Sequence, residues 1–308
     1  MRKVTLLMIA AFLFVQLLAL AVGSQFVAQK VSVVDNPADP ANAGYFFAYV
    51  LFSAVMLLLL LKFYHGNLFF VALEFVLLFF SLQILFSLLA ADGLVAAGAA
   101  LLITLGRFKI PFIRSFLLLV ASAVVGALLG SSLDILPAVI FSGLLAGYDV
   151  VAVFYTKHMV TLAKGLSERG AAFSIQITAE KKIEARRAGA RPALKLPKGD
   201  GAYRQGIATK VAGPGAAGRE RDSVETIELG TGDLVIPAML MVSSLKLDAA
   251  GGIPLHAIAA FAGSVIGMAA LFWVLERQRG YWPALPPLVF GALLGLALLQ
   301  ILIVLKVV

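Results

Sequence analysis

Residues 147–154 read Gly147-Tyr148-Asp149-Val150-Val151-Ala152-Val153-Phe154, and residues 230–237 read Gly230-Thr231-Gly232-Asp233-Leu234-Val235-Ile236-Pro237. Each stretch holds one aspartate in a segment that is otherwise apolar enough to cross a bilayer. Placing a carboxylate in hydrocarbon costs about 2.5 to 3.5 kcal/mol even on a mild scale, so each one needs a partner or a water-filled cavity. Asp149 and Asp233 are therefore the first candidates for a functional site.

The chain as a whole has the composition of a membrane protein. Of its 308 residues, 61% are hydrophobic and 14% are charged, whereas soluble domains carry about 25% charged residues. Fourteen of the 25 Lys and Arg residues fall between Lys157 and Arg221, so the net charge marks one loop beside anionic lipid, and we expect no nucleic-acid partner. The absence of cysteine excludes disulfides, thiolate metal ligands and a cysteine nucleophile.

Apolar runs predict an all-α, polytopic membrane protein of nine transmembrane helices, because about 20 residues span the hydrocarbon of a bilayer. The predicted spans are 4–28, 44–63, 68–90, 93–106, 111–130, 133–156, 229–247, 252–275 and 284–305. They divide one membrane domain into helices one to six (1–156), a basic flexible cytoplasmic loop (157–228) and helices seven to nine (229–308). The apolar run of the first span is longer than the roughly 7 to 15 residues of a signal-peptide core, so we expect a retained helix.

The basic residues also predict the orientation of the chain. With nine alternating spans, Lys and Arg gather on one side, and the exceptions are Lys30, Lys246 and Lys306. The positive-inside rule then places the N-terminus in the cytoplasm and the C-terminus outside.

Glycine pairs four residues apart predict close helix packing. These pairs are Gly126/Gly130, Gly143/Gly147, Gly263/Gly267 and Gly291/Gly295.

In this topology both aspartates lie in the cytoplasmic half of the membrane. Asp149 precedes Lys157 by about 12 Å along its helix, and Asp233 lies about 6 Å past Leu229 on a helix that runs the other way. Two carboxylates a few ångströms apart cannot both ionise, so they share a proton and provide an acid and a base at one pH. In aspartic proteases such a pair activates water for attack on a peptide carbonyl.

The residues around Asp233 favour a site that a peptide can reach. Gly230 and Gly232 remove side chains from the approach to the carboxylate. Pro237 cannot donate to the Asp233 carbonyl, so we expect a helix distorted at Asp233. Irregular backbone at membrane depth is tolerated only where it is buried or lines a wet cavity. Just upstream, residues 224–229 are expected to be extended.

Three short motifs resemble the signatures of the intramembrane aspartyl proteases that include presenilin and signal peptide peptidase. The family signatures are Tyr-Asp, Gly-x-Gly-Asp and Pro-Ala-Leu. This chain has Tyr148-Asp149, Gly230-Thr231-Gly232-Asp233 and Pro283-Ala284-Leu285, on predicted spans six, seven and nine. The orientation of the basic loop makes the chain look like a microbial presenilin homologue.

The resemblance implies a presenilin-like fold and a hydrolase, an aspartic endopeptidase that cleaves transmembrane helical protein substrates within the lipid bilayer. It implies that Asp149 and Asp233 are the catalytic pair. The residues that it implies for shaping the site and binding substrate are Tyr148, Gly230, Gly232, Pro283, Ala284 and Leu285. Pro286 biases Leu285 away from helix, so we expect the Leu285 backbone groups to be free for hydrogen bonds.

The main alternative is a cation or proton channel or transporter, because paired intramembrane aspartates also form ion pathways. The chain has no internal repeat that would support it.

A zinc protease would lack ligands, since His65, His158 and His256 are scattered, so we expect neither a metal nor a cofactor. Glu74 is the other deep acid, and pairing with a polar group or facing a cavity is a better explanation for it than catalysis. Ser264 is expected to pack between helices. A homo-oligomer is a further possible assembly.

Overall fold

The computed structural model of this chain covers most of the predicted membrane part and two pieces of the predicted loop. It describes residues 2–64, 66–89, 92–107, 111–156, 174–181, 223–248, 252–277 and 282–305. Residues 157–173 and 182–222 of the loop lie outside these ranges. The flexible loop therefore stays a prediction.

Helices make up nearly all of the described chain, as the all-α prediction requires. They are α1 (Arg2–Ala28), α2 (Ala41–Phe63), α3 (Leu68–Leu89), α4 (Gly93–Gly106), α5 (Pro111–Ser132), α6 (Ile135–Val151), the π-helix η1 (Ala152–Thr156), α8 (Thr231–Ser244), the 3₁₀-helix η2 (Leu245–Leu247), α9 (Leu255–Arg277) and α10 (Leu285–Val304). Within the described residues, seven helices are long and apolar enough to cross a membrane. Because α4 and α8 have only 14 residues each, the predicted count of nine spans is approximate.

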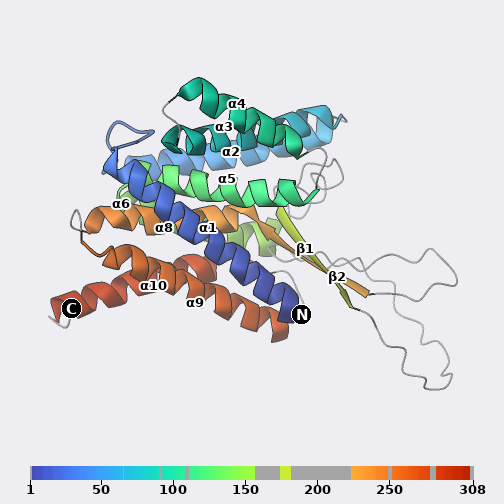
Figure 1. The fold of residues 1–308 in the computed structure, drawn as a ribbon. Coiled ribbons are helices and arrows are strands. Elements are labelled where there is room, and N and C mark those ends of the chain that lie inside the picture. The colour runs from blue at the N-terminus through green and yellow to red at the C-terminus, as the bar shows by residue number, and fades with distance from the viewer. Residues whose placement is uncertain are drawn as a thin grey trace, which may run out of the picture.

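A two-stranded antiparallel sheet extends from one end of the helix bundle (Figure 1). It consists of β1 (Ser174–Lys181) and β2 (Ser223–Gly230), with Ser174 paired to Gly230. The prediction that 224–229 is extended is confirmed, whereas β1 was not predicted. We call this end of the bundle the sheet end, and the opposite end, where the chain terminates at its C-terminus, the far end (Figure 1).

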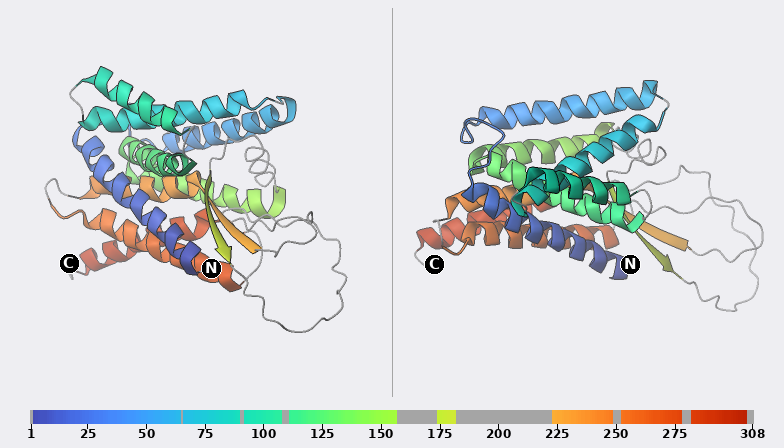
Figure 2. Two further views of the ribbon diagram at one scale, coloured as in Figure 1. Left: turned by 45° about the vertical axis from the view of Figure 1, so that its right-hand side comes forward. Right: turned by 45° about the horizontal axis from the view of Figure 1, so that its top comes forward.

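The central helix of the bundle is α8, which lies between α5 on one side and the pair α9 and α10 on the other (Figure 2). Its Leu234 and Ala238 face a core shared with α1, α5 and α9. Its Ile236 and Leu240 face a second core shared with α6 and α10. A helix that is apolar around its whole circumference needs this complete burial, and all residues from Ile236 to Ser244 are buried.

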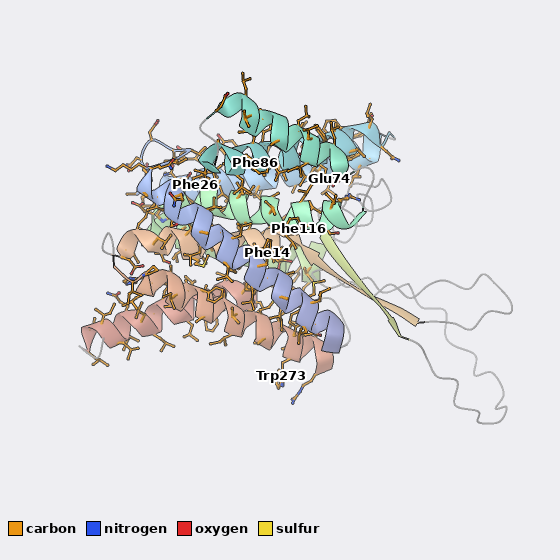
Figure 3. All side chains as sticks on the ribbon, in the orientation of Figure 1. Phe14, Phe26, Glu74, Phe86, Phe116 and Trp273 are labelled. Atoms are coloured by element: carbon orange, nitrogen blue, oxygen red, sulfur yellow. The ribbon has the colours of Figure 1, made fainter. Side chains whose placement is uncertain are left out.

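The first helix is packed into the bundle. Met8, Phe12 and Val15 are fully buried, and the rings of Phe14 and Phe116 join α1 to α5 with centroids 5.6 Å apart (Figure 3). These contacts make α1 part of the core that it shares with α5 and α8, whereas its retention stays a prediction.

Three of the four glycine pairs lie in close helix contacts, as predicted. These are Gly126/Gly130 between α5 and α8, and Gly263/Gly267 with Gly291/Gly295 between α9 and α10. The prediction for the fourth pair is wrong, because Gly143 and Gly147 are exposed and a Cβ added at either would meet no atom within 4 Å. Along this face α6 has no close neighbour among the described residues, so its position depends on contacts elsewhere.

Candidate active site

Asp149 lies near the sheet end of α6, two residues before the α-helix ends at Val151. Only 5% of the residue is exposed. The chain continues directly into the π-helix η1, a wider turn that is rare and occurs frequently at functional sites. A carboxylate buried this deeply needs hydrogen-bond donors to offset its loss of water.

The donors for Asp149 come from the start of α10. The Leu285 backbone N–H donates to Asp149 Oδ2 at 3.2 Å, and the Ala284 backbone N–H is a second donor to this carboxylate. Ala284 is the N-cap and Leu285 the first residue of α10, so neither N–H has an acceptor within the helix. The carboxylate also lies at the positive end of the α10 dipole, where a negative charge is stabilised.

Asp233 lies in the first turn of α8, and Gly230 is the N-cap of that helix. The Asp233 side chain folds back toward the cap, where the Gly230 backbone N–H is its hydrogen-bond donor. A Cβ on Gly230 would lie 3.1 Å from Asp233 Oδ2, tighter than ordinary contact. The first glycine of the Gly-x-Gly-Asp motif therefore leaves room for the carboxylate that follows it.

The distortion predicted at Asp233 is wrong. Regular helix begins at Thr231, two residues earlier, and the extended backbone ends at Gly230. Pro237 lies inside the helix. It removes the one hydrogen bond that would reach the Asp233 carbonyl, and a single lost bond does not end a helix that is packed on all sides.

The two carboxylates come together at the sheet end of the bundle. α6 and α8 are neighbours that run in opposite directions, and the Asp149 carboxylate is close enough for its charge to act on Asp233. Each carboxylate is also held at the N-terminus of a helix, Asp149 by α10 and Asp233 by α8. Three helices thus meet at this pair, which can hold a shared proton and polarise a water molecule.

The remaining predicted site residues surround the pair in different ways. Tyr148 is half-buried, and its ring packs edge-on against Phe47 of α2 with centroids 6.3 Å apart. Gly232 is exposed, and a Cβ there would meet nothing within 4 Å, so this side of Asp233 is open. Pro283 is buried beside Ala284 at the start of α10.

The expectation that Leu285 departs from helix is wrong. α10 begins at Leu285 because the prolines that follow occupy the first helical turn, where their missing N–H groups would have no partner in any case. The expectation that its backbone is free to form hydrogen bonds holds for the N–H, which donates to Asp149.

The other deep acid belongs to a separate cluster, as predicted. Glu74 of α3 is fully buried (labelled in Figure 3). Arg114 donates to its two oxygens at 2.7 and 2.8 Å, and Arg107 Nη1 lies 3.1 Å from Oε1.

Ser264 is buried and donates to the Phe261 carbonyl at 2.8 Å, which fits a packing role. Among the residues that the structure describes, no group of three or more His, Asp or Glu forms a metal site.

Two aromatic residues at the site were missed from sequence. Phe154 lies in η1 and Trp282 directly precedes Pro283, and their rings meet edge-on at 6.1 Å. This contact joins the same two segments as the hydrogen bond between Leu285 and Asp149. An aromatic residue beside each motif was visible in the sequence, but nothing in the spacing indicated that the two would touch.

Comparisons with known proteins identify the family of this chain. The family model described as signal-peptide peptidase, presenilin aspartyl protease matches residues 9–185 and 206–305. A structure of a presenilin family intramembrane aspartate protease in space group C222 has 23% identity and a TM-score of 0.66, covering 97% of this chain and 99% of that chain. A structure described in the same words, in space group P2, has 25% identity and a TM-score of 0.61, covering 96% of each chain. No curated protein matches the chain. The chain therefore belongs to the signal-peptide peptidase and presenilin family, and it is an intramembrane aspartic endopeptidase.

Proposed function

We propose that Asp149 and Asp233 are the catalytic pair of this protease and that they activate one water molecule between them. One observation carries the proposal. The two carboxylates reach the same place from neighbouring antiparallel helices, and backbone N–H groups at the start of α10 hold Asp149 there. A pair that shares one proton supplies the base and the acid that peptide hydrolysis requires.

In the proposed reaction the ionised carboxylate accepts a proton from water, and the water oxygen bonds to the scissile carbonyl carbon. The protonated carboxyl donates a hydrogen bond to the oxygen on which negative charge develops. The amide nitrogen then takes up a proton, the C–N bond breaks, and an acid and an amine leave. The hydrogen bond from Leu285 keeps the Asp149 carboxylate oriented throughout, so little reorganisation is needed in the transition state.

The proposed substrates are transmembrane segments of proteins, whose helical backbone must unwind before its carbonyl can be attacked. We infer that the unwound segment becomes extended and adds as a strand beside residues 224–229, with the Leu285 segment on its other side. Two observations support this. β2 leads directly into the Gly-x-Gly-Asp motif, and β1 pairs with one edge of β2, which leaves the opposite edge of β2 as the place for substrate.

Proline scanning of residues 224–229 tests the strand model. Proline removes one backbone N–H at a time, so substitutions at residues whose N–H faces the substrate edge should lower cleavage. At the alternating positions the N–H faces β1, so proline there should weaken the pairing of β2 with β1 rather than its contact with substrate. Cleavage that is unchanged in every variant would reject the model.

We also propose that the sheet end faces the cytoplasm, which the basic residues of 157–221 favour. Because the chain has no cysteine, a single Asp39→Cys substitution reports the side of the membrane on which the α1–α2 loop at the far end lies. A reagent that cannot cross membranes should label this cysteine in intact cells. Labelling only after permeabilisation would show that the far end faces the cytoplasm and would contradict the proposed orientation.

The experiment that tests the catalytic pair is cleavage of a transmembrane peptide by purified protein in detergent. Asp149→Asn and Asp233→Asn should each remove cleavage, because neither carboxyl can fill both roles. Ser264→Ala is the matched control, since that buried hydroxyl donates to the Phe261 carbonyl of its own helix. Cleavage that survives in either asparagine variant would refute the assignment.

A further inference from the structure

The two helices that carry the aspartates are also fastened to each other at their other ends. At the far end, α6 begins after the α5–α6 turn at Leu133 and Asp134, and α8 ends next to Ser243 and Lys246. We call these four residues the far-end clamp. None of them is near the catalytic pair.

The clamp is centred on the Leu133 carbonyl oxygen. Ser243 Oγ donates to this oxygen at 2.9 Å, and Lys246 Nζ donates to it at 3.1 Å. The same Nζ lies 2.8 Å from Asp134 Oδ1. Leu133 and Ser243 are fully buried, whereas the Asp134 side chain is 40% exposed, so the buried part of the clamp is the pair of bonds to the carbonyl.

The start of α6 explains why this carbonyl needs outside donors. Leu133 precedes Asp134, the N-cap of α6, so its carbonyl lies outside the helix and receives no helical N–H. By contrast, the next carbonyl, that of Asp134, receives the Ala138 N–H at 3.0 Å. Ser243 and Lys246 supply the donors for the Leu133 carbonyl instead, so side chains at the end of α8 fasten the start of α6.

The clamp sets the two aspartates at matching depths. Asp149 lies 15 residues beyond Asp134 on α6, which is about 22 Å along the axis. Asp233 lies 13 residues before Lys246 on α8, which is about 20 Å along the neighbouring helix. A slip of α6 against α8 by one residue would shift one carboxylate by about 1.5 Å and rotate it by about 100°.

Apolar contacts hold α6 along one face only, where Phe141 packs in the core shared with α8 and α10 and against Phe46 of α2. The face of α6 that carries Gly143 and Gly147 meets no side chain of another element within the described residues. α5 and α8 are in close contact, since a Cβ at Gly130 would lie 2.6 Å from the Met239 carbonyl oxygen. The clamp therefore ties the start of α6 to a rigid α5–α8 unit, while the other end of α6 is held by the bond between Asp149 and Leu285.

We propose that Ser243 and Lys246 are positioning residues, which fix the axial register of α6 against α8 and thereby bring Asp149 and Asp233 together. The proposal rests on the catalytic role proposed above for that pair. A partly exposed ion pair contributes little to stability, whereas a misplacement of about 1 Å at a catalytic group costs up to about 10²-fold in rate. Loss of the clamp should thus reduce turnover much more than folding.

The test has two independent readouts. In the cysteine-free chain, Asp149→Cys together with Asp233→Cys places two thiols at the site, and a short thiol-specific crosslinker measures their apposition. Adding Lys246→Met, alone or with Ser243→Ala, should lower the crosslinked fraction severalfold, and Lys246→Arg should restore it. Lys30→Met is the matched control, because it removes an exposed lysine from the far end without touching the clamp.

The second readout is peptide cleavage by chains that keep both aspartates. Lys246→Met should lower kcat about tenfold with KM changed less than about twofold, and Lys246→Arg should recover most of the loss. Unchanged crosslinking in Lys246→Met and Asp134→Asn, or a kcat loss that only tracks the folded fraction, would overturn the proposal. If the wild-type chain cleaves nothing, the catalytic assignment fails while the crosslinking still decides the register.

Discussion

Gly267→Ala should inactivate the protease by displacing the start of α10. A Cβ at Gly267 of α9 would lie 2.2 Å from the Pro287 carbonyl oxygen and 3.1 Å from Leu288 Cα. These are backbone atoms, so no side chain can turn away to make room. Pro287 is two residues after Leu285, whose N–H holds Asp149. The substitution therefore acts on the site through one rigid turn of helix.

The size of the effect follows from these distances. Ordinary contact begins at 3.4 Å, so α9 and α10 must separate by about 1 Å at this level. A shift of that size lengthens the 3.2 Å bond between Leu285 N and Asp149 Oδ2 to about 4 Å, beyond hydrogen-bonding distance. We expect a loss of about 1 to 3 kcal/mol of stability from overpacking and a fall in kcat of about 10²-fold.

Gly295→Ala is the matched control in the same helix pair. A Cβ there would lie 2.2 Å from the Ala259 carbonyl oxygen, so the clash is equal, but it occurs about 12 Å further along α10 from Pro287. Both variants should unfold at similarly lowered temperatures in detergent, and only Gly267→Ala should lose most peptide cleavage at a temperature where both are folded. Equal activity losses in the two would show that stability alone explains the effect and would refute the argument.

Two further predictions concern the glycines of the motif and the buried ion cluster. Gly230→Ala crowds Asp233 Oδ2 at 3.1 Å and should lower kcat severalfold with little change in thermal unfolding. Gly232→Ala enters open space, so it should leave kcat unchanged, and any effect should fall on KM. Equal kinetics in the two would contradict this. Glu74→Leu removes the carboxylate beside the buried guanidinium of Arg107 and should cost about 3 to 5 kcal/mol of unfolding free energy, measured by denaturation in detergent. An unchanged midpoint would show that the cluster is not needed for folding.

The parts of the fold that could be predicted are those fixed by local chemistry. In lipid every backbone group must be satisfied within its own segment, so apolar runs predict helices reliably. The similar depth of the two aspartates followed from the same runs, and the structure places them on the neighbouring helices α6 and α8. The extension of 224–229 was also readable, because it immediately precedes a glycine-rich helix start.

The parts that could not be predicted depend on which segments meet. Gly143 and Gly147 have the spacing of a packing motif, but spacing shows only that a helix can approach and not that one does. β1 lies about 40 residues from its partner β2 in the chain, and it has no motif of its own. The role of Leu285 N–H required knowing that α10 points its N-terminus at Asp149, which is a tertiary fact.

The way in which this bundle tolerates two buried carboxylates also explains why its activity should be sensitive to helix packing. A helix N-terminus stabilises a carboxylate by about 0.3 to 1 kcal/mol, and by up to about 2 kcal/mol when partly buried, less than the roughly 2.5 to 3.5 kcal/mol that burial costs. A second contribution is required, and in the proposed mechanism the sharing of one proton supplies it by removing one of the two charges. Such sharing requires that α6, α8 and α10 stay docked together. We therefore expect that loss of contacts distant from the pair, such as the far-end clamp and the α9–α10 glycines, first appears as lost turnover in a protein that is still folded.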